Sequence, residues 1–190
     1  TMKIDKNRSM VFIAVFAALI SVCAFISIPV PGTPIPIVLQ NMMTVLSGLL
    51  LGPILGTAST ALFIFAGLLG LPIFSGGTGG LAKLTGPTGG FIIGYLFASF
   101  VAGLLAGRPQ VGKKTSVIRL SIATIFGFIV MYIPGIWHFM NSLNKTMPET
   151  MSMCVIPYIP GDLIKAVLCT VIATKLRGAF ASIVFKDCND

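Results

Sequence analysis

The sequence predicts an all-α integral membrane protein, with six transmembrane helices in one bundle and both termini in the cytoplasm. Hydrophobic residues make up 55% of the 190 residues and charged residues only 9%, whereas a soluble domain carries about 25% charged residues. Six stretches approach the roughly 20 apolar residues that a helix needs to cross the hydrocarbon of a bilayer. Lys and Arg gather on one side of these stretches, as they do beside the spans of membrane proteins.

The six predicted spans follow one another within one membrane domain, residues 1–190. The first ends at the turn PVPGTPIP, and a tight Gly52-Pro53 break separates the second from the third. The fourth lies between glycines, the fifth ends near Trp137, and the sixth follows Pro160-Gly161. The predicted spans cover approximately residues 9–28, 38–51, 53–71, 90–107, 117–137 and 161–184.

The basic residues predict the orientation. Ten of the 13 lie on the side that holds both termini, two lie on the other side, and Lys165 lies within a span. Cytoplasmic loops collect Lys and Arg, so we expect both termini to be cytoplasmic. The basic residues are too few and too scattered for a nucleic-acid-binding face. The ten are Lys3, Lys6, Arg8, Arg108, Lys113, Lys114, Arg119, Lys175, Arg177 and Lys186; the two are Lys83 and Lys145.

The four cysteines predict neither a metal site nor a disulfide across the membrane. Cys23 and Cys169 fall within spans, Cys154 on the outer side and Cys188 on the inner side. Their spacings match no zinc pattern. We interpret them as small buried hydrophobic residues, and we expect no cofactor.

The outer connections predict an ordered cap over a ligand pocket. The second connection, LPIFSGGTGGLAKLTGPTGG, is too apolar for a plain linker because it contains Phe74, Leu81 and Leu84. Its glycines, among them Gly79, Gly89 and Gly90, would let the backbone approach a ligand closely. A flexible outer loop is the alternative, because glycine supports both. Residues 77–82 match a dinucleotide-binding pattern only formally, since they follow a membrane helix rather than a strand.

The heptapeptide PGDLIKA, residues 160–166, places Asp162 and Lys165 on one helix face near the outer start of the sixth span. Ionisable residues within a membrane span usually pair, face the bundle interior and indicate a functional site. Two alternatives stay open: an acid that simply favours the helix N-terminus, or an ion pair that is only structural. The residues expected at the same depth are Gln40, Asn41, Ser75, Tyr95, Trp137 and Tyr158.

These residues together predict a small-molecule pocket with aromatic walls, few polar groups and one ion pair. For Trp137 and Tyr158 the alternative is an anchor at the membrane interface. The first span carries Ala14, Ala17, Ala18 and Ser21, whose spacing lets another helix approach closely. That partner is either an internal helix or a separate subunit.

The chain resembles the BioY family, the biotin-specific S components of energy-coupling-factor (ECF) transporters. The resemblance rests on residues 71–80 (LPIFSGGTGG), 86–95 (GPTGGF followed by Gly94-Tyr95) and 160–166 (PGDLIKA). It implies a multi-pass protein of a bacterial plasma membrane that is not an enzyme and captures biotin with high affinity from outside. It also implies a transmembrane coupling subunit (T component), which would dock at Ala14 and Ala18, and two ATPase subunits. The S component is expected to topple in the membrane to deliver its ligand inward.

The chemistry of the pocket agrees with such a ligand. An Asp acceptor beside a Lys donor suits the edge of the ureido ring of biotin, although Lys165 alternatively pairs with the biotin carboxylate; we favour the ureido arrangement. The competing functions are an S component for another vitamin and a solitary secondary transporter for a small solute. An intramembrane enzyme would need a nucleophile, base or metal cluster, which one His and one intramembrane Asp do not supply.

Overall fold

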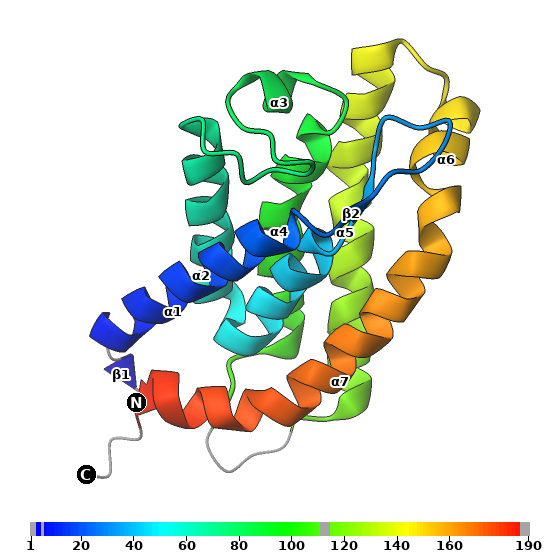
Figure 1. Cartoon of the computed structure of the whole chain (residues 1–190). Helices are drawn as coiled ribbons and strands as arrows, with labels where there is room; N and C mark the ends of the chain where they lie inside the picture. The colour runs from blue at the N-terminus through cyan, green and yellow to red at the C-terminus, as the bar shows by residue number, and fades with distance from the viewer. Residues whose placement is uncertain (1–2, 5, 111–114, 187–190) are drawn as a thin grey trace.

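The computed structural model describes residues 3–4, 6–110 and 115–186, and in these residues the chain forms one helical bundle (Figure 1). The helices are α1 (Lys6–Cys23), α2 (Gln40–Leu68), α3 (Ala82–Thr85), α4 (Gly89–Ala106), α5 (Val117–Leu143), α6 (Met147–Cys154), the 3-10 helix η1 (Ile156–Tyr158) and α7 (Ile159–Val184). Strand β1 (Lys3–Ile4) pairs antiparallel with β4 (Phe185–Lys186), and β2 (Ser27–Ile28) with β3 (Ile37–Val38).

Six apolar helical segments cross the bundle. Four helical runs are long and apolar enough to span a membrane, namely α2, α4, α5 and the run 147–183 that contains α6 and α7, and α1 adds a shorter apolar helix. The sixth segment arises because α2 bends back on itself at Gly52, whose φ of 82° and ψ of 178° are not helical. Glycine adopts a positive φ without steric cost, and Pro53 cannot donate the next helical hydrogen bond. The break predicted at Gly52-Pro53 therefore forms a tight helical hairpin.

Close packing holds the two halves of α2 together and against α4. A Cβ atom at Gly56 would lie 2.7 Å from the Gly48 backbone, and one at Gly48 would lie 2.1 Å from the Ser99 carbonyl oxygen. The hydroxyls of Ser47 and Ser99 lie 3.1 Å apart in this interface. Small residues thus let the backbones approach closely, which is how helices associate in a membrane. This arrangement leaves room between the outer ends of α2, α4, α5 and α7.

Two helix ends differ most from the predicted spans. Helix α1 ends at Cys23, before the predicted residue 28, because the following residues turn into the β2–β3 pair. Helix α5 continues to Leu143, beyond Trp137, and ends only where Asn144 adopts a left-handed conformation with φ of 50°. Residues 138–143 are therefore helical beyond the predicted end of the span.

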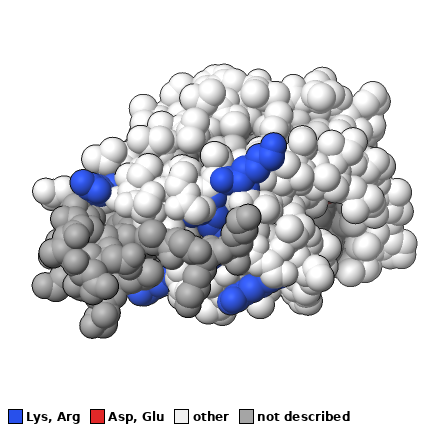
Figure 2. Space-filling view, turned by 90° about the horizontal axis from the view of Figure 1, so that it is seen from below, with Lys and Arg blue, Asp and Glu red and all other residues white. Residues whose placement is uncertain are grey.

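The two ends of the bundle differ in charge. We name the end with α3, α6 and the β2–β3 pair the outer end, and the end with β1 and β4 the inner end, following the predicted orientation (Figure 1). Figure 2 looks at the inner end and shows Lys and Arg but no Asp or Glu among the residues coloured there. Of the residues assigned to this side, Lys113 and Lys114 lie outside the described residues. The pairing of β1 with β4 brings both chain ends to the same side.

Candidate functional site

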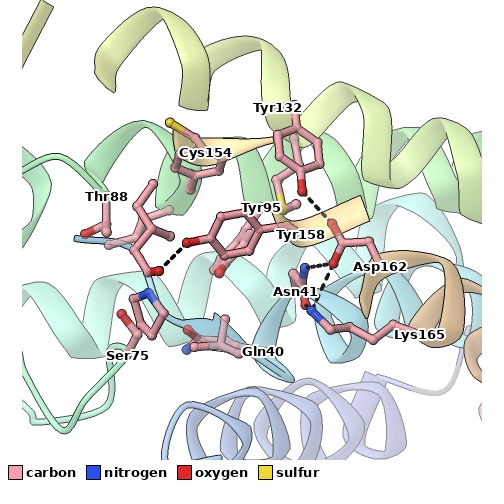
Figure 3. Close-up of a pocket in the computed structure, with 16 residues that line it drawn as sticks. Gln40, Asn41, Ser75, Thr88, Tyr95, Tyr132, Cys154, Tyr158, Asp162 and Lys165 are labelled. Carbon is pink, nitrogen blue, oxygen red and sulfur yellow. Dashed lines mark hydrogen bonds and ion pairs between the residues drawn. The ribbon is translucent and has the colours of Figure 1, made fainter. Parts of the chain in front are cut away.

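A hollow lies at the outer end of the bundle, between α2, α4, α5, α7 and the segment that precedes β3. Its empty volume is about 550 Å³, which includes open solvent at the mouth. Figure 3 shows the side chains converging on it. Its lining is Ile35, Pro36, Val38, Gln40, Asn41, Ser75, Thr88, Phe91, Ile92, Tyr95, Met131, Tyr132, Cys154, Tyr158, Asp162 and Lys165.

An ion pair forms the polar end of this pocket. The Asp162 Oδ1 and Lys165 Nζ atoms are 2.9 Å apart on successive turns of α7, with 11% and 10% of the two side chains exposed. Buried charges are stable only when they are paired and hydrogen-bonded. The sequence predicted this pair from its spacing, and the structure turns both members toward the pocket (Figure 3).

Asn41 completes the charge network from the first turn of α2. Its Nδ2 donates to Asp162 Oδ1 at 3.2 Å, and its Oδ1 accepts from Lys165 Nζ at 3.1 Å. One amide therefore bridges both charges and joins α2 to α7. Neighbouring Gln40 donates from Nε2 to the carbonyl oxygen of Ile73 at 3.3 Å, which holds the glycine-rich connection beside the pocket.

Tyr132 on α5 is a member of the network that the sequence did not predict. Its hydroxyl donates to Asp162 Oδ2 at 2.5 Å, and its ring packs edge-on against Phe91 with centroids 5.8 Å apart. Hydrogen bonds to a carboxylate are stronger than those between neutral groups. Asp162 thus contacts α2, α5 and its own helix at once, so its position is well defined.

Tyr158 ties the first outer connection to the pocket. Its hydroxyl donates to the carbonyl oxygen of Ile35 and lies 2.7 Å from Thr33 Oγ1. Ile35 and Pro36 line the pocket from this segment. The segment between β2 and β3 therefore covers one side of the mouth, and the phenol of Tyr158 attaches it to the bundle by hydrogen bonds.

The short outer helix α6 contributes the thiol of Cys154, which is 1% exposed. Its start is defined by a capping box in which Thr146 and Glu149 bond each other reciprocally. The Thr146 backbone N–H, and then its hydroxyl, hold the pKa of the Glu149 carboxyl below its usual value. This capping box defines the start of α6, the short helix that follows α5 and brings Cys154 to the pocket.

Comparison with known proteins decides the family. A model of the BioY family matches residues 2–182. The chain belongs to the BioY family. Biotin transporter BioY of Lactococcus lactis subsp. cremoris is 37% identical over 176 residues, covering 91% of this chain and 92% of that protein. Biotin transporter BioY of Thermotoga maritima is 35% identical over 170 residues, covering 90% and 96%.

A solved structure has the same fold. The crystal structure of the S-component for biotin from an ECF-type ABC transporter matches this chain with a TM-score of 0.80 and 32% identity. The match covers 90% of this chain and 92% of that one. The fold predicted from the sequence, a membrane bundle of six helices, is therefore confirmed.

Seven of the predicted ligand-binding residues of this BioY-family chain line one pocket: Gln40, Asn41, Ser75, Tyr95, Tyr158, Asp162 and Lys165. They come from α2, the glycine-rich connection, α4, η1 and α7, which are far apart in the sequence. Their roles in binding stay a prediction.

The five other predicted residues do not line the pocket, and two of them are aromatic. Trp137 is 69% exposed on the outer surface of α5, because residue 137 lies on the helix face opposite the bundle interior. Phe74 is buried at 1% exposure and packs edge-on against Phe63 with centroids 5.5 Å apart. Neither side chain lines the pocket, and their assignment to the ligand stays a prediction.

The three glycines lie close to the backbone of this chain, and none of them lines the pocket. A Cβ at Gly79 would lie 2.2 Å from the Leu71 carbonyl oxygen, and one at Gly89 would lie 1.8 Å from the Leu84 carbonyl oxygen. At Gly90 it would lie 2.3 Å from the Pro134 carbonyl oxygen, in the α4–α5 interface. None of the three has a positive φ. The close approaches seen here pack the cap and the helices, and the expected approach of these glycines to a ligand stays a prediction.

Helix α1 has two pairs of small residues, Ala14 with Ala18 and Ala17 with Ser21, and the pairs lie on different faces of the helix. Ala17 is 7% exposed, and its carbonyl oxygen accepts a hydrogen bond from Ser21 Oγ at 2.8 Å. Ala14 and Ala18 are exposed. The 17/21 pair therefore faces the bundle, while the 14/18 pair leaves a shallow surface for a separate helix.

Proposed function

We propose that this chain is the high-affinity substrate-capture component, or S component, for biotin in an ATP-driven ECF-type vitamin uptake transporter. It is a multi-pass protein of the plasma membrane. The observation that carries the proposal is the buried Asp162–Lys165–Asn41 network at the end of an otherwise largely apolar pocket. The relatives named biotin transporter support biotin as the ligand.

The chemistry of biotin suits this network. Its ureido ring presents two N–H donors and one strong acceptor oxygen on a rigid edge. Asp162 supplies acceptors and Lys165 a donor, and Lys165 uses two of its three N–H groups within the protein. The thiolane ring and the alkyl chain of biotin fit against apolar and aromatic walls such as Ile92 and Tyr95. The carboxylate of biotin then lies near water at the mouth.

The opposite orientation places the carboxylate of biotin against Lys165. Biotin amide separates the two arrangements because it lacks that charge. If Lys165 binds the ureido oxygen, biotin amide binds nearly as well as biotin, and Lys165→Met weakens both ligands alike. If Lys165 binds the carboxylate, biotin amide binds poorly to the parent protein, and the substitution adds little further loss.

An S component needs subunits that supply energy. We propose a transmembrane coupling subunit and two ATPase subunits as partners. The exposed Ala14 and Ala18 on α1 suit close approach by a helix of the coupling subunit. A solitary transporter predicts uptake that survives depletion of ATP, whereas the proposed function predicts uptake that stops.

The direct experiment is calorimetric titration of the purified protein with biotin and, in parallel, with other vitamins. We expect saturable tight binding of biotin alone. Stronger binding of a different vitamin would assign the chain to another substrate, and a folded protein that binds no vitamin would contradict the proposal.

A further inference from the structure

Two hollows in the outer half of the bundle share one wall. The first is the ligand pocket, and the second is a crevice between α5 and α7. Only Tyr132 and Asp162 line both of them among the described residues. The crevice is lined by Ile125, Phe128, Ile129, Tyr132, Ile159, Asp162, Leu163 and Ala166.

The crevice opens on the lipid-facing surface of the bundle. Ile129 is 52% exposed on α5, and Leu163 is 62% exposed on α7. Apolar side chains exposed on membrane-spanning helices face hydrocarbon. The crevice therefore brings the bilayer interior up to the wall that Tyr132 and Asp162 form.

A carboxylate in such a wall needs protection. A charge that faces hydrocarbon is costly, and so is a polar group without a partner. Oδ1 of Asp162 is engaged on the pocket side by Lys165 and Asn41. In the part of the chain that the structure describes, Tyr132 is the donor that reaches the other oxygen, Oδ2, at 2.5 Å.

The ring of Tyr132 is itself held from the pocket side. Phe91 of α4 packs edge-on against it, with an interplanar angle of 88°. Figure 3 shows the phenol of Tyr132 directed at Asp162 from the α5 side. Loss of the hydroxyl of Tyr132 would therefore remove the hydrogen bond, and loss of its ring would also remove the wall between the hollows.

We propose that Tyr132 seals the ligand pocket against the bilayer. Its hydrogen bond holds the Asp162 carboxylate on the pocket side, and its ring closes the inner end of the crevice. Tyr132 acts through Asp162 and is a positioning residue. The proposal assumes nothing about the identity of the ligand, so it is tested separately from the proposed function.

The test is the reactivity of Asp162 toward carbodiimides in liposomes without ligand. Dicyclohexylcarbodiimide partitions into hydrocarbon and modifies carboxyl groups there, whereas a water-soluble carbodiimide arrives through the mouth of the pocket. The chain has only five acidic residues, and Asp162 is the one within a predicted span. Peptide mass spectrometry therefore reports its modification directly.

We expect slow modification of Asp162 by the lipophilic reagent in the parent protein. Tyr132→Phe should raise that rate about tenfold or more, the factor that corresponds to a lost hydrogen bond to a charged group. Tyr132→Ala, which also removes the wall, should raise it at least as far. The rate of Asp162 modification by the water-soluble reagent should change less. The ratio of the lipophilic rate to the water-soluble rate should therefore rise in the variants.

Tyr95→Phe is the matched control, because it removes a phenol hydroxyl from the same pocket and does not line the crevice. It should leave the lipophilic rate at the parent level. Tyr132→Phe keeps the ring, so it remains informative if Tyr132→Ala does not fold. A parent-like rate in Tyr132→Phe would overturn the proposal. An equal rise in the rates of Asp162 modification by both reagents would overturn it too. Such a result would mean that the substitution makes Asp162 more accessible from every side and not specifically from the lipid.

Discussion

Arg177 on α7 donates from Nη1 to the carbonyl oxygen of Leu49 at 2.9 Å, and Leu49 is the residue whose helical hydrogen-bond partner would be Pro53. Proline has no N–H group, so this carbonyl would otherwise lack a partner. Nη2 of the same guanidinium donates to the carbonyl oxygens of Ala106, at 2.9 Å, and Gly107. One side chain, 4% exposed, thus joins α7 to the break in α2 and to the end of α4.

Replacing this guanidinium should destabilise the fold. Arg177→Met leaves buried carbonyl groups without donors, and each such group costs about 1–3 kcal/mol. We expect the free energy of unfolding in detergent to fall by about 3 kcal/mol or more. Lys175→Met is the control, because it removes an exposed positive charge from the same helix. Equal stability of the two variants would show that the carbonyl contacts of Arg177 contribute nothing.

Tyr158 attaches the first outer connection to the bundle. We therefore expect biotin to dissociate more slowly from the parent protein than from a Tyr158→Phe variant. Tyr158→Phe removes the donor to Ile35 and the contact with Thr33. The segment between β2 and β3 should then open more often, and biotin should dissociate about 2–10-fold faster, as expected for one neutral hydrogen bond. A chase with unlabelled biotin measures this rate. An unchanged dissociation rate would mean that this segment does not limit release.

The exposed alanines of α1 predict a defect in coupling and not in binding. Ala14→Trp places a bulky side chain on the exposed face, so biotin binding by the isolated protein should persist while ATP-dependent uptake is lost. Ala17→Trp is the contrasting variant, because Ala17 is buried and its enlargement should disturb the fold. Loss of binding in Ala14→Trp would show that this face packs internally.

The basic inner end predicts the topology. In a variant without the native cysteines, Met147→Cys on α6, where residue 147 is 51% exposed, should react with an impermeant thiol reagent added to intact cells. Gln110→Cys, exposed beyond α4, should react only after permeabilisation. The reverse labelling pattern would place both termini outside.

Local sequence rules predicted the polar centre of the site because those residues lie at recognisable helix starts. Asp162 and Lys165 share one face three residues apart, and Asn41 opens the second predicted span. The Gly52-Pro53 break was also visible, since it combines the residue that tolerates positive φ with the residue that lacks an N–H.

Tertiary packing decided what the sequence did not reveal. The fifth span was predicted to end near Trp137, but α5 runs to Leu143. Tyr132 lay within the predicted span, but its spacing in the sequence did not show that it faces the pocket. The neighbouring helices decide which face of α5 meets the bundle. In this packing Tyr132 faces the pocket, whereas Trp137 lies on the exposed face. Glycine spacing cannot say whether a backbone approaches a ligand or another part of the chain, and here Gly79 and Gly89 approach the chain.

The affinity of purified Asp162→Asn and Lys165→Met variants for biotin tests the central claim most directly. Each substitution removes a charged partner from the pocket, and a hydrogen bond to a charged group contributes about 1.5–3 kcal/mol. Calorimetry should show affinity reduced roughly tenfold to a hundredfold in each variant. Val167→Ala, at a position 64% exposed on the same helix, should bind as the parent does. If both folded charge variants also bind biotin as tightly as the parent, the ion pair is only structural and the site proposed here is wrong.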